Sequence, residues 1–158
     1  MPNLTIAQIE DALLAAIRAD SDLKLVANGG YTKLIDSYAG QFEQAKDEII
    51  LLYPCVLVLF VKAAYDTNAN RSADCRLTFD VLVADQNLRG SKGAARGSAG
   101  SVGTYRMMED VRDLLQGNRL GLDALDPLHL TQQSLVAYTP DISVYALEFE
   151  CGMVVRNI

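Results

Sequence analysis

The sequence predicts an α+β domain in which a mostly antiparallel sheet of about four or five strands carries two main helices on one face. Two segments, residues 76–84 and 143–153, alternate apolar and polar residues with the two-residue period of a strand. A continuous apolar run at residues 55–61 and two stretches with helical spacing complete the pattern. The expected order is α-β-β-β-α-β-β, and residues 1–158 are expected to form one domain.

The first helix is predicted to end near Ala19. Thr5 and Gln8 have the spacing of a capping box, in which each side chain bonds a free backbone amide of the first turn. Apolar residues then recur at helical spacing along one stripe, namely Ile6, Ile9, Leu13, Ala16 and Ile17. After a turn signal at residues 28–30, residues 31–38 fit either a strand or a short helix, and we favour a strand.

Residues 55–61 are apolar on both alternating faces, which is typical of a central strand covered on both sides. The polar residues 65–72 are expected to form the loop of an antiparallel hairpin that leads into the strand at 76–84. We expect one core in which sheet residues pack against the two helices. Its predicted members are Leu57, Leu59, Phe79, Val81, Leu147 and Phe149 from the sheet and Ile9, Leu13, Val111 and Leu115 from the helices.

The second helix is predicted for residues 102–116, with Gly117 as its left-handed C-terminal residue. Two strands follow, at about 128–138 and 143–153, with a turn at Thr139, Pro140 and Asp141 between them. In the last strand, Tyr145, Leu147, Phe149, Cys151 and Met153 share one face. Glu148 and Glu150 lie on the other face, two residues apart, where we expect an exposed sheet surface or a subunit contact rather than a catalytic carboxylate pair.

One segment differs in composition from the rest of the chain. Residues 86–108 contain no acidic residue but carry four basic ones, Arg89, Lys92, Arg96 and Arg106. Because the whole chain has a net charge of −6, the other residues together carry −10. Five of the eleven glycines also lie here. Residues 86–103 are therefore predicted to form a flexible basic loop, either a solvated linker or an arm that becomes ordered against an acidic neighbour.

Composition excludes several classes of protein. A net charge of −6 and a pI near 4.7 argue against a dedicated nucleic-acid binder. The apolar run at residues 49–61 is shorter than the roughly 20 residues of a membrane-spanning helix, and residues 1–5 have no basic region typical of a signal peptide. Cys55, Cys75 and Cys151 cannot all pair and are expected to be buried structural thiols in a reducing compartment.

The sequence predicts no enzyme, no cofactor and no metal site. A P-loop requires Gly-Lys-Ser/Thr before its helix, but Lys92 is followed by Gly93, and the glycines at 97–103 do not match the dinucleotide-binding pattern. His129 is the only histidine, which excludes a histidine-rich metal site, and it is expected at a strand edge or in the core. Glu109, Asp110 and Asp113 are expected on the solvated side of the second helix.

A succession of short motifs without catalytic content covers nearly the whole chain. The motifs are the segments at 53–58, 79–84, 87–90, 96–97, 103–105, 109–117, 127–128 and 144–149, for example Tyr-Pro-Cys-Val-Leu-Val at the start and Val-Tyr-Ala-Leu-Glu-Phe at the end. In this order the motifs resemble a family of small tail proteins of Mu-like phages and prophages.

The resemblance implies a tail terminator, a subunit that forms a ring, typically hexameric, on the head-proximal end of the tail tube. Its implied partners are other copies of the chain, the tail tube protein and a neck or connector protein. It would reside in the host cytoplasm during assembly and then in the virion, without recognising nucleic acid or membrane. Charge and glycine content alone select the candidate assembly contacts, Arg89, Lys92, Arg96, Glu148 and Glu150.

Two other function classes stay open at this point. One is another phage neck protein, such as a head-tail connector or a tail-completion subunit, which would bind the portal side rather than tube ends. The other is a bacterial ligand-binding or regulatory domain, whose gene would have no tube, sheath or tape-measure genes as neighbours.

Overall fold

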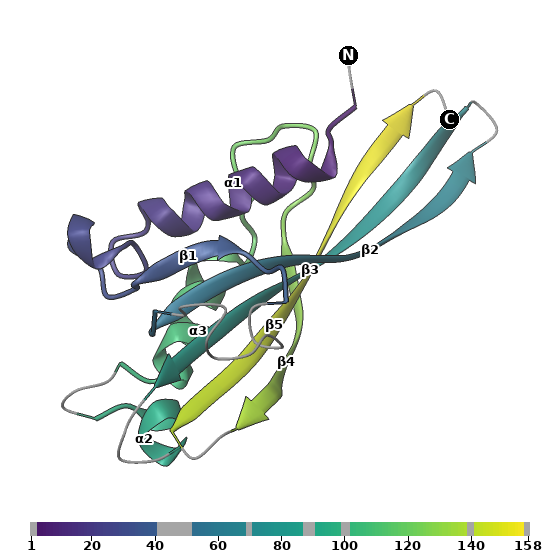
Figure 1. Cartoon of the computed structure of the whole chain (residues 1–158). Helices are drawn as coiled ribbons and strands as arrows, with labels where there is room; N and C mark the ends of the chain where they lie inside the picture. Colours follow the sequence, from purple (N-terminus) through teal and green to yellow (C-terminus); the bar gives the residue numbers. More distant parts are fainter. Residues whose placement is uncertain are drawn as a thin grey trace.

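The computed structural model describes residues 3–40, 52–68, 71–86, 91–98, 102–138 and 141–156. At its centre is a five-stranded sheet in the order β1-β2-β3-β5-β4 (Figure 1). β1 runs parallel to β2, and each of the other neighbouring pairs is antiparallel. The strands are β1 (Leu34–Ser37), β2 (Cys55–Asn68), β3 (Ser72–Gln86), β4 (His129–Tyr138) and β5 (Ile142–Arg156). The predicted mostly antiparallel sheet is confirmed.

Two long helices, α1 (Ile6–Ala19) and α3 (Thr104–Leu115), pack on the same face of this sheet (Figure 1). α1 contacts β1 and β2, whereas α3 contacts β3 and β5. The predicted element order is confirmed, with two short additions, the 3-10 helix η1 (Val26–Asn28) and the helix α2 (Ser91–Arg96). The result is an α+β arrangement in which one helical layer covers one sheet.

Local sequence signals set the ends of both long helices. At the start of α1, the Thr5 hydroxyl accepts a hydrogen bond from the Gln8 amide at 3.1 Å, and the Gln8 side chain accepts one from the Thr5 amide at 2.8 Å. The predicted capping box is therefore present. After α3, Gly117 adopts a φ of +76°, and its amide donates to the Leu128 carbonyl at 2.8 Å. That left-handed conformation favours glycine.

The main core lies between the helices and one face of the sheet. Phe79 and Phe149 lie directly opposite each other on β3 and β5 and are fully buried there, as are Val81 and Leu147. The helical partners predicted for them, Ile9, Leu13, Val111 and Leu115, belong to the same core.

The prediction that Leu57 and Leu59 of β2 pack against the helices is wrong. Leu57 is buried, but on the other side of the sheet, in a second cluster with Leu82 and Ala146, and Leu59 is only half-buried. Val56 and Val58 face the helices instead. Because both alternating faces of β2 are apolar, the sequence pattern cannot tell which face meets the helices.

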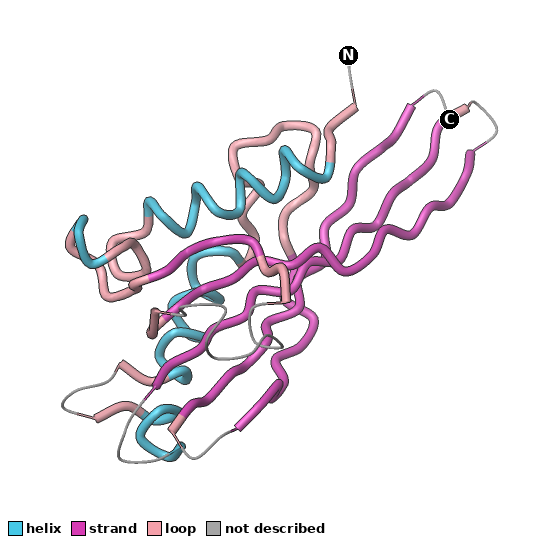
Figure 2. The backbone as a smooth tube through the Cα atoms, in the orientation of Figure 1, coloured by secondary structure: helices cyan, strands magenta, loops and turns pink. Residues whose placement is uncertain are grey.

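The predicted hairpin loop at residues 65–72 is also too long. β2 continues to Asn68 and β3 begins at Ser72, so most of the polar segment is strand, paired from Tyr65 opposite Cys75 to Asn68 opposite Ser72. β2 therefore extends far beyond β1, which pairs only with residues 55–58 (Figure 2). β5 likewise extends beyond β4, whose first residue, His129, lies opposite Glu150.

Candidate assembly surface

The basic segment between β3 and α3 contains a helix that is attached to the protein body. Within α2, Ala94 and Ala95 are buried. α2 contacts α3, β3 and β5 at the lower end of the molecule in Figure 1. The prediction of a loop throughout residues 86–103 is therefore wrong for α2, because small alanine side chains allow a short helix to pack closely against the body. The predicted flexibility of the whole segment stays a prediction.

A buried carboxylate and a glycine fix the far end of this segment. Asp85, at the end of β3, is almost fully buried and accepts a hydrogen bond from the Gly103 amide at 2.7 Å. Gly103 has a φ of +89°, and a Cβ atom there would lie 2.4 Å from the Gly97 backbone nitrogen. Only glycine allows this close approach. Next to it, the hydroxyls of Thr104 and Ser143 share a buried 3.0 Å hydrogen bond.

These contacts place two of the predicted basic contact residues. Lys92 and Arg96 are exposed on α2, whereas Arg89 lies outside the described residues. The ion pairs found in the described ranges join Arg106 to Asp110 and Arg112 to Asp113, so Lys92 and Arg96 take part in neither. Attachment of α2 to the body thus presents two positive charges at a defined position, which lowers the entropy cost of using them in a contact.

The fourth basic residue of the segment is already paired inside the molecule. The Arg106 guanidinium lies 5.3 Å from the centre of the Tyr31 ring and 3.7 Å from the Asp110 carboxylate. The Tyr31 hydroxyl donates to the same carboxylate at 2.7 Å. Burial, together with this bond, raises the pKa of Tyr31, so its hydroxyl stays protonated and donating. The sequence analysis missed this cluster, although the four-residue spacing of Arg106 and Asp110 on one helix indicates the ion pair.

The predicted acidic contacts lie on the sheet face opposite the helices. Glu148 accepts hydrogen bonds from the Thr131 hydroxyl at 2.8 Å and the Gln132 amide at 3.1 Å, both on β4. Directly across from Glu148 on β3 is Asp80, another carboxylate. Partial burial, and then the charge of Glu148, raise the pKa of Asp80. Like charges in directly opposed positions destabilise a sheet, so this pair is a source of local repulsion.

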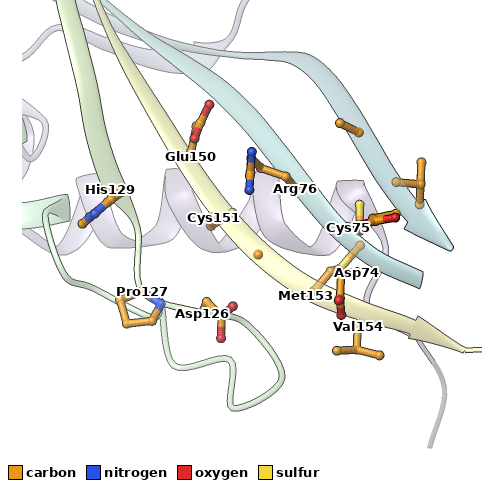
Figure 3. A pocket seen from close by; sticks show the side chains of 14 residues that line it. Asp74, Cys75, Arg76, Asp126, Pro127, His129, Glu150, Cys151, Met153 and Val154 are labelled. Atoms are coloured by element: carbon orange, nitrogen blue, oxygen red, sulfur yellow. The ribbon is translucent and has the colours of Figure 1, made fainter. Parts of the chain in front are cut away.

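Glu150 lines a separate groove of about 690 Å³ where β3 and β5 extend past β4 (Figure 3). Four of its lining residues are carboxylates and one is a guanidinium. They are Asp66, Asp74, Asp126 and Glu150, together with Arg76. This excess of negative charge favours a positively charged protein surface over phosphate or nucleic acid. The structure places Glu148 and Glu150 on one face of the sheet, the face opposite the helices.

The three cysteines of the chain are poorly suited to nucleophilic catalysis. All three cysteines are buried and free, as predicted. Burial is the main cause that raises the pKa of both Cys55 and Cys151 to about 12, so their thiols stay protonated at neutral pH. His129 is exposed at the start of the edge strand β4, and its Nδ1 lies 3.3 Å from the Gln116 side-chain nitrogen.

In the described ranges, no three histidine, cysteine or acidic residues are grouped so that they could hold a metal ion. No helix in those ranges is both long and apolar enough to cross a membrane.

A comparison with known protein families shows which family the chain is similar to. A family model described as "Bacteriophage Mu, Gp37" matches residues 5–154. The chain belongs to the bacteriophage Mu Gp37 family. As a Gp37-family member it is a structural, tail-related protein of a Mu-like phage or prophage, which confirms the family resemblance of the sequence motifs. No curated protein matches the sequence.

Proposed function

We propose that this protein is a tail terminator. It forms a ring on the head-proximal end of the tail tube, stops further polymerisation of the tube and presents a surface to which the head is joined. The observation that carries this proposal is the Gp37-family match over residues 5–154, together with the order of tail-protein motifs along the same region.

The charge distribution supports assembly into a ring. A closed ring of identical subunits needs a contact between two different surfaces of the same chain. Lys92 and Arg96 on α2 supply a positive surface, while Glu150 and its groove supply a negative one elsewhere on the sheet. Such complementary charges mainly set the orientation and the rate of encounter.

A ring of this kind stops polymerisation by occupying the surface onto which the next layer of tube subunits would be added. Its opposite face then becomes the end of the tail, which the neck binds. Neither step makes or breaks a covalent bond, so a tail terminator needs no catalytic residue and no cofactor.

The direct test adds the purified protein to tail tube protein that is polymerising and measures tube lengths by negative-stain electron microscopy. A terminator gives shorter tubes with an extra ring at one end, and the tubes stop growing when more tube protein is added. Bound protein at the portal side, with tube growth unchanged, would instead identify a head-tail connector. Unchanged tube length and no binding to either component would refute a role at the tail end.

A further inference from the structure

Among the described residues, two edges of the sheet have no neighbouring strand. On one side, β1 pairs only with residues 55–58 of β2, so residues 62–67 of β2 have no strand on their outer side among the described residues. On the other side, β4 is the last strand of the sheet, and its residues 132–137 pair only with β5 within the described part of the chain. Unpaired strand edges present rows of hydrogen-bonding groups that readily pair with another strand.

The two edges differ in how they are protected. Soluble proteins commonly protect an exposed edge with charged residues, proline or β-bulges. The β2 edge carries Lys62 and Asp66, whereas residues 131–137 of β4 contain no charged residue, no proline and no glycine, although all seven are exposed. Two bulges, after Leu130 and after Leu135, leave residues 132–135 as the regular part of this edge.

Exposed apolar side chains concentrate on the same two edges. Eight large apolar residues are exposed in the described part of the chain, and four of them are Val61 and Tyr65 on β2 and Leu135 and Val136 on β4. Tyr65 and Leu135 point to the helix-covered side of the sheet, because each lies opposite a residue packed against the main core, Cys75 and Tyr145 respectively. Both edges therefore present an apolar group on the same side.

The strand directions also match. β2 and β5 run the same way and β4 runs against them, so β4 of one copy meets β2 of the next copy in antiparallel orientation when the two sheets are continuous. Tyr65 lies level with Met153 of β5 and Leu135 level with Tyr145. If Tyr65 of one copy lies beside Leu135 of the next, the two copies are displaced along the strand direction by the distance from Tyr145 to Met153. That distance is eight residues, or about 26 Å at 3.3 Å per residue. Sheets that close on themselves require a stagger of this kind.

We propose that the β4 edge of one copy pairs with the β2 edge of a second copy, with Leu135 beside Tyr65, so that the sheets of neighbouring subunits are continuous. The contact uses two different surfaces and leaves each copy with a free edge for the next, as a ring requires. Lys62 and Asp66 then meet an uncharged strand, and no like charges are opposed. This inference rests on the proposed ring and identifies the subunit contact within it.

The first test uses one substitution at two sites. Val136 on the β4 edge and Val26 on η1 have nearly the same exposure, 50% and 54%, so Val26→Lys is a matched control for Val136→Lys. Sedimentation velocity across a concentration series measures assembly, and circular dichroism verifies that each variant is folded. We expect wild-type and Val26→Lys proteins to assemble alike, and Val136→Lys to weaken self-association about tenfold or more, because a lysine protects the edge.

A second test keeps the inference falsifiable if Val136→Lys does not fold. With Tyr65 beside Leu135, antiparallel register places Thr67 opposite Gln133, and both residues are exposed. The double variant Thr67→Cys, Gln133→Cys is expected to form disulfide-linked chains longer than dimers under mild oxidation, while each single variant is not. Dimers from Gln133→Cys alone would show β4–β4 pairing and overturn the inference.

Equal self-association of all three proteins, or a double variant that forms no linked chains, would also overturn it. The tube-length assay is judged separately. If the protein caps tubes but Val136→Lys does not weaken its self-association, it is a terminator with a different subunit contact. If it pairs through these edges but leaves tube length unchanged, it is not a terminator.

Discussion

Truncation of Phe79 to alanine tests the assignment of the main core. The Phe79 side chain is fully buried on β3, between Phe60 on β2 and Phe149 on β5. Its ring centre lies 5.4 Å from that of Phe60, at an interplanar angle of 62°. Removing a buried phenylalanine side chain costs about 3–5 kcal/mol of unfolding free energy, and an edge-on aromatic pair accounts for about 0.5–1.5 kcal/mol beyond burial.

Urea unfolding followed by circular dichroism measures this cost, and thermal unfolding should show a decrease in Tm of about 6–20 °C for a chain of this size. The control is Val154→Ala, an apolar truncation at an exposed position on the neighbouring strand β5, which should change stability by about 0.5 kcal/mol or less. A double-mutant cycle with Phe60→Ala should give a coupling energy within the range for aromatic pairs. A Phe79→Ala variant within 1 kcal/mol of wild type, or a coupling energy of zero, would refute the assigned register.

Three further predictions concern charges and titratable groups. Changing Arg89, Lys92 and Arg96 together to serine should leave the Tm of the monomer nearly unchanged but weaken assembly. The difference in assembly from wild type should become smaller as the salt concentration rises, and sedimentation at several ionic strengths measures it. Because the folded-state pKa of Asp80 is raised, its ionisation destabilises the folded protein as pH rises through that pKa. Asp80→Asn should therefore be more stable than wild type at pH 7, by about 0.2–1 kcal/mol, and the gain should vanish below the unfolded-state pKa of about 4; an equal gain at pH 3 would contradict this. His129→Gln should fold and assemble as wild type, since its side chain is exposed and has no catalytic partner among the described residues, and loss of tail assembly by the folded variant would count against this view.

The candidate site was only partly predictable from the sequence. Composition alone identified the basic segment and the two glutamates of β5, because charge and two-residue alternation are properties of the sequence itself. It did not predict that Ala94 and Ala95 hold α2 against the body, or that Arg106 pairs with Asp110 and lies over the Tyr31 ring. The contact with Tyr31 joins residues far apart in the sequence, and no local pattern indicates such a pair.

The sequence by itself determined the elements with strong local periodicity. The alternation in β3 and β5, the capping box of α1 and the glycine after α3 each depend on neighbouring residues, and the structure agrees with all of them. Tertiary structure decided what local patterns leave open. Both faces of β2 are apolar, so its sequence does not decide which face meets the helices. The pairing of β2 with β1 and β3 makes that choice, and it turns Leu57 away from the helices. Within the polar segment, residues 65–68 became strand because backbone pairing with β3 outweighs weak local preferences. The same pairing creates the long free edge of β2, a feature that depends on which strands end early and therefore exists only in the assembled sheet.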